Sequence, residues 1–458
     1  MEFLGISLDV KNLPELDPGH IPLHKFNTAF LEGAGKPLGI AVERSGGEIA
    51  VKRTFIHGTP RFAEADRYYV GRLVKSMLWL YGGWKVYICG DRDICESLRS
   101  DYAPGGAREF DAGFMSDVYE RPFEVVYCEA LPQEYSRPQA VGRHLEGCRI
   151  GFDAGGSDRK VSAVIDGESV FSEEVVWFPK VTEDPDYHFE GIVSALRSAA
   201  AHMPRVDAIG VSSAGIYIDN RTMVASLFLK VPRDKFEEKV KDIYIRAARE
   251  IGDVPLTVAN DGDVTALAGA MSLGENNILG IAMGTSEAVG YVDGHGNITG
   301  WLNELAFMPV DANPDAMTDE WSGDIGCGVK YFSQDAVIKL APAAGIELDP
   351  SVSPAEKLKA VQALMESGDA RAEAVYRSIG VYLAHALALY DGYYGFKYVL
   401  LLGRVMSGRG GDTVLAKCRE VLADEYPRLA ARVIPTLPDE KFRRVGQSAA
   451  AASLPEIK

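Results

Sequence analysis

The hydrophobic pattern of residues 1–145 predicts a small α/β module. Two alternating apolar runs around a Ser-Gly-Gly turn predict a β-hairpin over 37–56. Apolar residues at helical spacing then predict a helix over 63–81, which two glycines end. The remaining expected elements are an irregular arm over 1–25, strands over 84–90 and 123–131, and a helix over 94–102. Together these elements indicate a ββαβαβ order.

A second pattern begins after a linker over 132–147, which contains two prolines and alternating polar residues. It mixes antiparallel strand meanders with parallel strand–helix steps, and two such α/β halves make a cleft where ligands usually bind. We therefore expect an N-terminal α/β module of unknown role over 1–145, a first lobe over 146–275 and a second lobe over 276–458. The other expected elements are strands at 148–156, 161–178, 206–215, 254–261, 277–285 and 398–403, a hairpin at 287–299, helices at 188–202, 234–251 and 262–271, and surface loops at 310–323 and 342–356.

Composition narrows the class of protein. The 458 residues carry a net charge of −17, with 47% hydrophobic and 25% charged residues, which are ordinary globular values. An acidic chain repels a phosphate backbone, so no nucleic-acid partner is expected. No apolar run is long enough to span a membrane, and the N-terminus lacks a secretory signal. Six cysteines without C-x-x-C or zinc-finger spacing suit a reducing cytoplasm, which is the expected location.

The first candidate site follows the strand at 148–152. In the sequence Asp153-Ala154-Gly155-Gly156-Ser157, the glycines permit a tight turn whose backbone N–H groups approach a phosphate closely. The Asp153 carboxylate can hold Mg²⁺, directly or through water, and the Ser157 hydroxyl can donate to a phosphate oxygen. An ordinary hairpin turn explains the same residues, so this motif alone does not establish a site.

The second candidate site is Asn260-Asp261, between an apolar strand and an apolar helix. Either side chain can cap that helix, which is the purely structural interpretation. In the functional interpretation Asp261 is a general base at the floor of a cleft. Phosphoryl transfer has a loose transition state, so such a base mainly orients the attacking hydroxyl and accepts its proton late.

Two further turns follow strands. Gly284-Thr285-Ser286 comes after an apolar strand, where backbone amides and a hydroxyl can hold a second phosphate. Gly403 ends the strand at 398–402, where the absence of a side chain lets a flat purine pack on the backbone. A simple hairpin and an ordinary strand–helix loop are the structural alternatives.

The order of these motifs resembles the actin-like sugar kinase superfamily, and within it the ROK family (repressors, open reading frames and sugar kinases). AIGVSSAGIYIDN resembles the strand and turn that line the sugar pocket, and VPLTVANDGDVTALAGA resembles the catalytic strand and helix. ILGIAMGTSEAVGYVDGHGNITG is similar to the phosphate hairpin, VLLLGRV to the adenosine loop and RRVGQSAAAASL to the closing helix. The resemblance covers about 148–454, two-thirds of the chain, and does not extend to 1–145.

This resemblance implies an α/β fold class: two ribonuclease-H-like lobes of the actin-like ATPase type around a nucleotide cleft, plus the N-terminal α/β module. It implies an ATP-dependent kinase with Mg²⁺, a sugar or polyol as its small-molecule partner, and a homodimer as a mild expectation. It assigns the general base to Asp261 and Mg²⁺ binding to Asp153. By the same resemblance, phosphates contact Gly155, Gly156, Ser157, Gly284 and Thr285, adenosine contacts Gly403, and sugar hydroxyls contact Asn260, Gly215 and Glu304.

The chain also departs from the family pattern. The lysine that the family places directly after the first glycine turn is absent, because Asp158 and Arg159 follow Ser157. The family histidine that touches the sugar and often binds zinc falls on Phe307. Further departures are Val329 in place of a glutamate, Arg404 in place of a glycine, and only Cys327 among the accompanying cysteines, so no zinc site is expected.

Three functions therefore compete. A carbohydrate kinase with unusual substrate choice is favoured by the retained Asp261 and phosphate turns. A non-catalytic nucleotide or sugar sensor is favoured by Phe307, Val329 and the additional N-terminal module. A transcriptional regulator, a class that the family includes, is disfavoured by the acidic charge and by the lack of a helix-turn-helix pattern.

Overall fold

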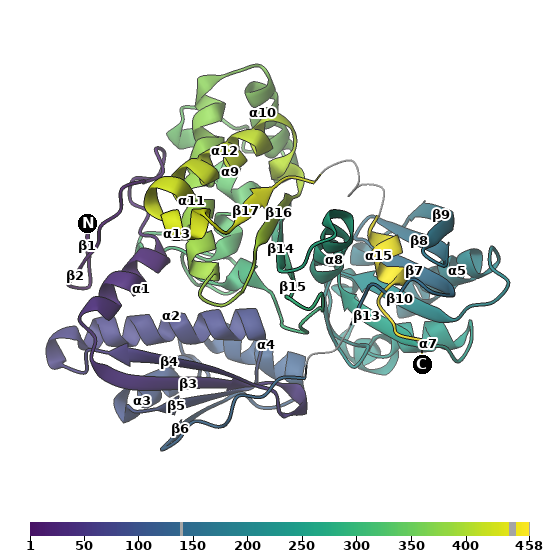
Figure 1. Ribbon diagram of the computed structural model, residues 1–458, viewed down its shortest axis with the longest axis horizontal. Coiled ribbons are helices and arrows are strands. Elements are labelled where there is room, and N and C mark those ends of the chain that lie inside the picture. Colours follow the sequence, from purple (N-terminus) through teal and green to yellow (C-terminus); the bar gives the residue numbers. More distant parts are fainter. Residues whose placement is uncertain (138–140, 439–445, 458) are drawn as a thin grey trace. The chain divides into compact units, whose positions relative to one another are not determined.

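The computed structural model describes residues 1–137, 141–438 and 446–457 (Figure 1). The chain divides into two compact units, each of which contains segments that are distant in the sequence. Unit 1 comprises Met1–Arg137, Ile281–Val289 and Trp301–Leu437, and unit 2 comprises Pro138–Gly280, Gly290–Gly300 and Pro438–Lys458. The boundaries expected at 145 and 275 stay predictions.

The N-terminal part of unit 1 contains a four-stranded sheet of order β4-β3-β5-β6. The expected hairpin is confirmed, because β3 (Lys36–Glu43) pairs antiparallel with β4 (Ile49–Ile56) around the turn at 45–47. Strand β5 (Lys85–Cys89) pairs antiparallel with β3 and parallel with β6 (Glu124–Cys128). The expected strand positions and the ββαβαβ order are therefore confirmed, with one additional helix before β6.

Four helices accompany this sheet, and Figure 1 shows the longest of them, α2, running alongside the strands. Helix α2 (Ala63–Tyr81) has the predicted bounds, and α3 (Arg92–Asp101) begins two residues before the expected helix, after the N-cap Asp91. Helices α1 (Leu23–Glu32) and α4 (Glu109–Tyr119) were not predicted from the sequence. Neither helix has a side-chain N-cap, and α4 buries the carboxylate Asp111, so the usual start signal and apolar stripe are both weakened. A short β1–β2 hairpin (Glu2–Phe3 and Ile6–Ser7) precedes α1.

Unit 2 is built on a five-stranded sheet of order β13-β10-β7-β8-β9. Strands β7 (Cys148–Ala154), β8 (Asp158–Ile165) and β9 (Glu168–Val176) form an antiparallel meander. Strands β10 (Ala208–Ser213) and β13 (Leu256–Asn260) add to β7 in parallel, so β7, β10 and β13 end at the same edge. A small hairpin of β11 (Ile216–Ile218) and β12 (Arg221–Val224) follows β10.

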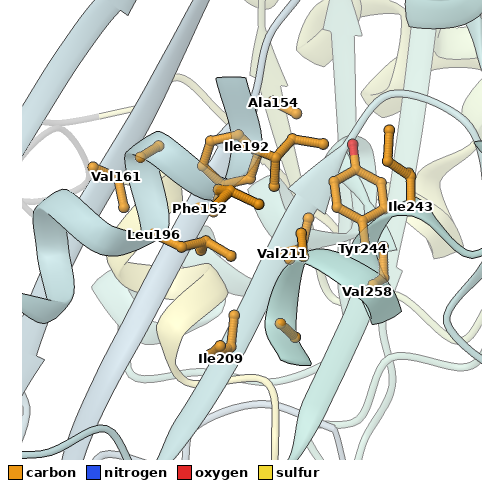
Figure 2. Packing of buried hydrophobic residues seen from close by; sticks show 14 of the residues in the cluster. Phe152, Ala154, Val161, Ile192, Leu196, Ile209, Val211, Ile243, Tyr244 and Val258 are labelled. Carbon is orange, nitrogen blue, oxygen red and sulfur yellow. The ribbon is translucent and has the colours of Figure 1, made fainter. Parts of the chain in front are cut away.

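Helices cover this sheet and complete its core (Figure 2). Phe152 of β7 and Val211 of β10 pack with Ile192 and Leu196 of α5 (Pro185–Ala200), all nearly or fully buried. Full burial of such side chains contributes about 1.5–3 kcal/mol each. The helix expected over 234–251 is interrupted: α6 (Arg233–Lys235), a π-helical segment (Phe236–Val240) and α7 (Ile243–Arg249) replace it.

Helix α15 (Gln447–Ala452) lies against the backbone of the same sheet. A Cβ at Gly151 of β7 would lie 1.7 Å from the Ser448 carbonyl oxygen, and a Cβ at Gly210 of β10 would lie 1.7 Å from that of Ala451. Only glycine in the strands and small residues in the helix permit this approach. The fully buried Ala450 and Ala451 are in accord with it.

The remainder of unit 1 is mainly helical, as expected, with helices α9 (Gln334–Ala343), α10 (Pro354–Glu366), α11 (Ala370–Tyr390), α12 (Gly408–Glu425) and α13 (Pro427–Ala430). A sheet of order β15-β14-β16-β17 contains the hairpin that carries Gly284 and Thr285. Its strands are β14 (Ile278–Met283), β15 (Glu287–Val292), β16 (Tyr398–Leu402) and β17 (Ile434–Thr436). The loop expected over 342–356 is shorter, because α9 runs into it and α10 starts at Pro354. The capping box of Ser353 and Glu356, with proline at the first helical position, is a sequence signal for that start.

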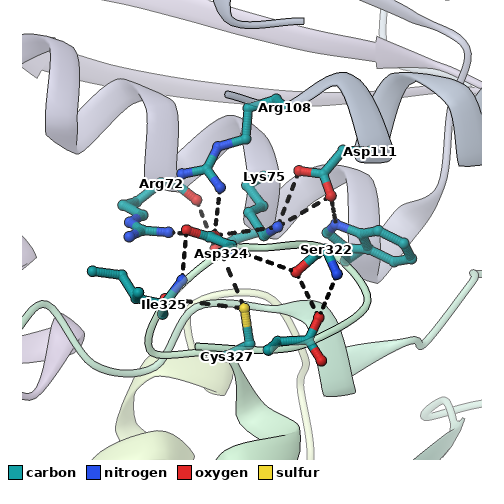
Figure 3. Close-up of polar contacts among 11 residues, drawn as sticks. Arg72, Lys75, Arg108, Asp111, Ser322, Asp324, Ile325 and Cys327 are labelled. Atoms are coloured by element: carbon teal, nitrogen blue, oxygen red, sulfur yellow. Dashed lines mark hydrogen bonds and ion pairs between the residues drawn. The ribbon is translucent and has the colours of Figure 1, made fainter. Parts of the chain in front are cut away.

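A buried charge cluster joins the N-terminal module to the rest of unit 1 (Figure 3). The Asp324 carboxylate pairs with Arg72 and Arg108 at 2.6 Å each and with Lys75 at 3.2 Å. Lys75 has no exposed surface and also pairs with Asp111 at 3.0 Å. Burial alone would raise the pKa of the Asp324 carboxyl, but the three cations hold it well below its ordinary value. The single carboxylate therefore compensates cations from two separate parts of the module.

Candidate functional site

The candidate site in unit 2 lies where its parallel strands end. Asp153 on β7 is in register with Ser212 on β10, and Asn260 ends β13 in register with Ser213. Because the carboxyl ends of parallel strands meet at one edge, these polar side chains come together there. Asp261 follows directly as the first residue of α8 (Asp261–Leu273).

A chain of hydrogen bonds runs from the Asp153 carboxylate to the backbone carbonyl oxygen of Asp261. The Ser212 hydroxyl donates to Asp153 Oδ1 at 2.9 Å. The Gln447 side-chain amide of α15 donates both to Ser212 Oγ and to the Asp261 carbonyl oxygen, at 3.0 Å each. The amide of Gln447 thus fixes the strand carrying Asp153 relative to the helix carrying Asp261.

Both carboxyl groups have raised pKa values. Burial, reinforced by the charge of Asp261, raises the pKa of Asp153 to about 6, although the hydrogen bond from Ser212 opposes the shift. Burial likewise raises the pKa of Asp261, while the Gly262 N–H group and the charge of Lys180 act in the opposite direction. Paired carboxyl groups with shifted pKa values are typical of catalytic and metal-binding sites.

Asn260 caps α8 and also holds Gly215. Its Oδ1 accepts from the Gly262 N–H group at 2.8 Å, and its Nδ2 donates to the Gly215 carbonyl oxygen at 2.8 Å. A Cβ at Gly215 would lie 2.6 Å from the Val224 carbonyl oxygen, and its φ of 142° suits glycine. The structural interpretation of Asn260 as a cap is confirmed, and the contact of Asn260 and Gly215 with sugar hydroxyls stays a prediction.

Two hydrogen bonds from Trp177 fix the glycine turn after β7. The Trp177 indole donates to the Gly155 carbonyl oxygen at 2.7 Å, and the Trp177 N–H group donates to that of Ser157 at 3.1 Å. The Ser157 hydroxyl is exposed and donates to Asp158 at 3.2 Å. The turn is therefore a fixed, solvent-facing backbone loop directly beside Asp153.

In unit 1 the structure brings the other two turns together. The turn Gly284-Thr285-Ser286 connects β14 and β15. Within it the Gly284 N–H group donates to the Ser286 carbonyl oxygen at 2.9 Å, and the Thr285 side chain is exposed. Gly403, at the end of β16, has a φ of 91°, and a Cβ there would lie 2.3 Å from the Met283 carbonyl oxygen. Gly403 therefore adjoins the residue immediately before the Gly284 turn.

We expect Gly403→Ala to destabilise unit 1 and distort this pair of turns. Strain at positive φ and overpacking together predict a loss of about 3 kcal/mol in the free energy of unfolding. Gly345 is a matched control, because it has a φ of 74° and no atom lies within 4 Å of its added Cβ. Gly345→Ala should cost about 1 kcal/mol. Equal urea midpoints for the two variants would show that the contact with Met283 is unimportant.

Glu304 and Phe307 lie on the segment that follows the hairpin. The Glu304 side chain is half-buried, and its N–H group donates to the Trp79 carbonyl oxygen at 2.9 Å. The Phe307 ring stacks on the Trp79 indole at 4.3 Å and also contacts Phe110 and Phe114. The aromatic residue found in place of the family histidine therefore packs against the N-terminal module.

Several residues at the site escaped the sequence analysis. Ser212 and Gln447 form its hydrogen-bonded centre, and the Tyr217 and Tyr244 hydroxyls both bond to Ser213 Oγ, at 2.6 and 2.8 Å. Ser212, Tyr217 and Gln447 lie in stretches that resemble the family, but the resemblance assigns them no role. Only the register of β10 with β7 places Ser212 opposite Asp153. Over the described residues there is no group of three His, Cys, Asp or Glu side chains that could hold a metal ion.

Comparison with known proteins identifies the fold. No family model matches the chain, and neither does any curated protein. Among solved structures, a ROK hexokinase from Thermus thermophilus is 19% identical with a TM-score of 0.51, over 67% of this chain and 97% of that one. A putative sugar kinase from Cytophaga hutchinsonii is 15% identical with a TM-score of 0.50, over 67% and 98%. A ROK-family transcriptional regulator, a homologue of the E. coli MLC protein, is 16% identical with a TM-score of 0.51, over 68% and 79%.

The protein therefore has the fold of the ROK-family sugar kinases. The expected α/β class is confirmed, with lobes of the actin-like ATPase type. Since the hexokinase matches over nearly its whole length, this chain contains additional sequence that the hexokinase lacks. None of the helices in the described part of the chain is long and apolar enough to cross a membrane.

Proposed function

We propose that the protein is an ATP-dependent carbohydrate kinase that transfers the γ-phosphoryl group of Mg-ATP to a hydroxyl of a sugar or polyol. The observation that carries this proposal is the pair Asp153 and Asp261, held together through Ser212 and Gln447 at the carboxyl edge of the unit 2 sheet. The pKa of Asp261 is raised, which suits a group that accepts a proton near neutral pH.

The residues of this chain fit a nucleotide and its metal. The glycine turn at 155–156 offers backbone N–H groups without side-chain obstruction, and Asp153 is an oxygen ligand of the kind that Mg²⁺ prefers. Bound Mg²⁺ would neutralise charge on the phosphates. Gly284 and Thr285 would contact further phosphate oxygens, and Gly403 would leave room for the adenosine.

Asp261 acts as the general base in this mechanism. It orients the acceptor hydroxyl and takes its proton as the new O–P bond forms, and Asn260, Gly215 and Glu304 orient the other hydroxyls. General-base catalysis of this kind contributes about 10²–10⁴ in rate. Because Phe307 stacks on Trp79 and supplies no hydrogen bond, we expect an acceptor with fewer polar contacts than glucose or mannose, such as a deoxy or acylated sugar.

ADP release by the purified protein tests the proposal. The assay supplies Mg-ATP with a panel of sugars, aminosugars, acylated sugars and polyols. Acceptor-dependent ADP release above the rate without acceptor would establish the kinase and its substrate class. Tight ATP binding without turnover on any acceptor would contradict it.

We expect Mg-nucleotide binding to weaken in mild acid. A proton on Asp153 competes with Mg²⁺, and its pKa of about 6 predicts about tenfold weaker binding at pH 5 than at pH 7.5. Because the pKa of Asp153 is raised in the folded state, its protonation stabilises the fold at low pH. Unfolding through this group therefore does not explain the expected loss of nucleotide affinity. Calorimetric titration with Mg-AMP-PNP measures the effect, and Asp153→Asn gives the pH dependence of the nucleotide itself. Identical pH profiles for the two proteins would contradict the role of Asp153.

A non-catalytic sensor is the second candidate. The likeness to the transcriptional regulator has the same TM-score as the likeness to the hexokinase, so the fold alone does not separate the two functions. Turnover separates them, because a sensor binds sugar or nucleotide without releasing ADP.

A further inference from the structure

The phosphate turn of unit 2 lacks a free cation among the residues that follow it in sequence. Lys160 lies 3.8 Å from Asp158 and 3.7 Å from Glu174 and is paired with these carboxylates. The Arg159 guanidinium lies over the Trp177 ring at 5.7 Å. Because the phosphoryl group carries negative charge during transfer, a cation from elsewhere in the chain would add to the compensation that bound Mg²⁺ supplies.

Lys180 lies directly against this turn, although it is separated from it by more than one strand in sequence. A Cβ at Gly156 would lie 2.6 Å from Lys180 Cε and 2.8 Å from Nζ. The end of the lysine side chain therefore lies in the space beside Gly156 that a side chain would otherwise enter. Lys180 is exposed and forms no ion pair with any residue that the structure describes.

The backbone of Lys180 is fixed relative to the turn. Lys180 is the central residue of a single 3₁₀ turn, Pro179–Val181, three residues after Trp177. Trp177 bonds to Gly155 and Ser157 of the phosphate turn, as described above. On the other side, the fully buried His188 ring bonds to the Pro179 carbonyl oxygen at 3.0 Å. The Lys180 side chain thus extends toward the glycine turn from a segment whose backbone is fixed by hydrogen bonds.

We propose that Lys180 is the phosphate-binding cation of this site, donating from its ammonium group to the terminal phosphate of ATP held over Gly155-Gly156. The proposal rests on the proposed kinase function. The charge of Lys180 also reaches the general base, because it acts to lower the pKa of Asp261.

Nucleotide binding by Lys180→Met tests this assignment. Isothermal titration would compare Mg-AMP-PNP, which has a terminal phosphate, with Mg-ADP, which lacks it. We expect Lys180→Met to weaken AMP-PNP binding about tenfold or more and to change ADP binding less than about twofold, because a charged hydrogen bond to the third phosphate is lost. Lys180→Arg should retain part of the affinity.

Lys160→Met is the matched control, since it removes one lysine from the same region and leaves the net charge equal to that of Lys180→Met. Equal affinity of Lys180→Met and the wild type for AMP-PNP, or an equal loss in Lys160→Met, would overturn the assignment while leaving the kinase proposal intact. A wild-type protein that binds neither nucleotide would overturn both proposals. Selective loss of AMP-PNP binding in Lys180→Met alone supports the assignment.

Discussion

Replacing Asp261 by asparagine is expected to reduce phosphoryl transfer by about 10²–10⁴-fold, the usual contribution of a general base. Asparagine keeps the size of the side chain and can still accept from the Gly262 N–H group, which lies 3.0 Å from Asp261 Oδ1. It cannot accept the proton of the acceptor hydroxyl. The affinity for Mg-AMP-PNP should therefore remain within about twofold of the wild-type value. Initial rates of ADP release and calorimetric titration measure the two quantities.

Asp253→Asn is the matched control for this experiment. Asp253 is an exposed carboxylate in the loop before β13, and its loss changes the net charge by the same amount. This variant should turn over at the wild-type rate. Full activity in Asp261→Asn would exclude Asp261 as the base, and parallel losses of rate and nucleotide affinity would show a structural effect instead.

Replacing Asp324 by asparagine is expected to destabilise unit 1 by about 3–5 kcal/mol, the usual cost of removing one partner from a buried ion pair. The change removes the carboxylate that pairs with Arg72 and Arg108. It leaves Lys75, which has no access to solvent, paired with Asp111. Thermal unfolding gives the loss of stability. Hydrogen exchange of the α2 amides locates it in the contact between the N-terminal module and the segment that carries Asp324.

Glu129→Gln is the control for the Asp324 variant. It breaks the pair between Arg92 and Glu129, whose side chains are 70% and 79% exposed, and such surface pairs contribute about 0–1 kcal/mol. Similar melting temperatures for the two variants would show that the buried cluster does not hold the module in place.

The same cluster predicts a pH dependence of stability. The folded-state pKa of Asp324 is depressed, so its contribution is fully present above the unfolded pKa of about 4 and is lost as the pH falls below that value. Asp324→Asn should therefore lose less stability than the wild type between pH 4 and pH 2. Denaturation with urea at these two pH values checks the difference.

Local patterns were sufficient to predict much of this fold. Helix α2 and the β3–β4 hairpin depend on spacing and turn chemistry within a few residues, and both have their predicted positions. Helix α4 was missed because its buried face contains Asp111, a residue that pairs with Lys75. The hydrophobic pattern cannot reveal that a partner 36 residues away makes a buried carboxylate acceptable.

The candidate site likewise contains residues that local motifs predict and residues that only tertiary packing brings into place. Asp153, Asn260 and Asp261 follow strands and were found from their motifs, and the fold brings them to one edge. Lys180 belongs to no motif, and the closing-helix motif that contains Gln447 assigns this residue no role. Gln447 reaches the site through the packing of α15, and Lys180 through the turn after β9. The roles of all these residues, and the expected domain boundaries, stay predictions until the variants are measured.

The position of helix α15 sets a constraint on how the protein is made. Its alanines cover Gly151 and Gly210, strand residues that leave the ribosome about 240–300 positions earlier. During that interval one face of the unit 2 sheet has no helix over its glycines, and Gln447 is absent from the carboxylate pair. Until α15 has been synthesised, unit 2 therefore cannot complete its site. Nascent chains that stall before residue 447 should expose the apolar sheet face that α15 covers. They should therefore be prone to aggregation and depend on chaperones.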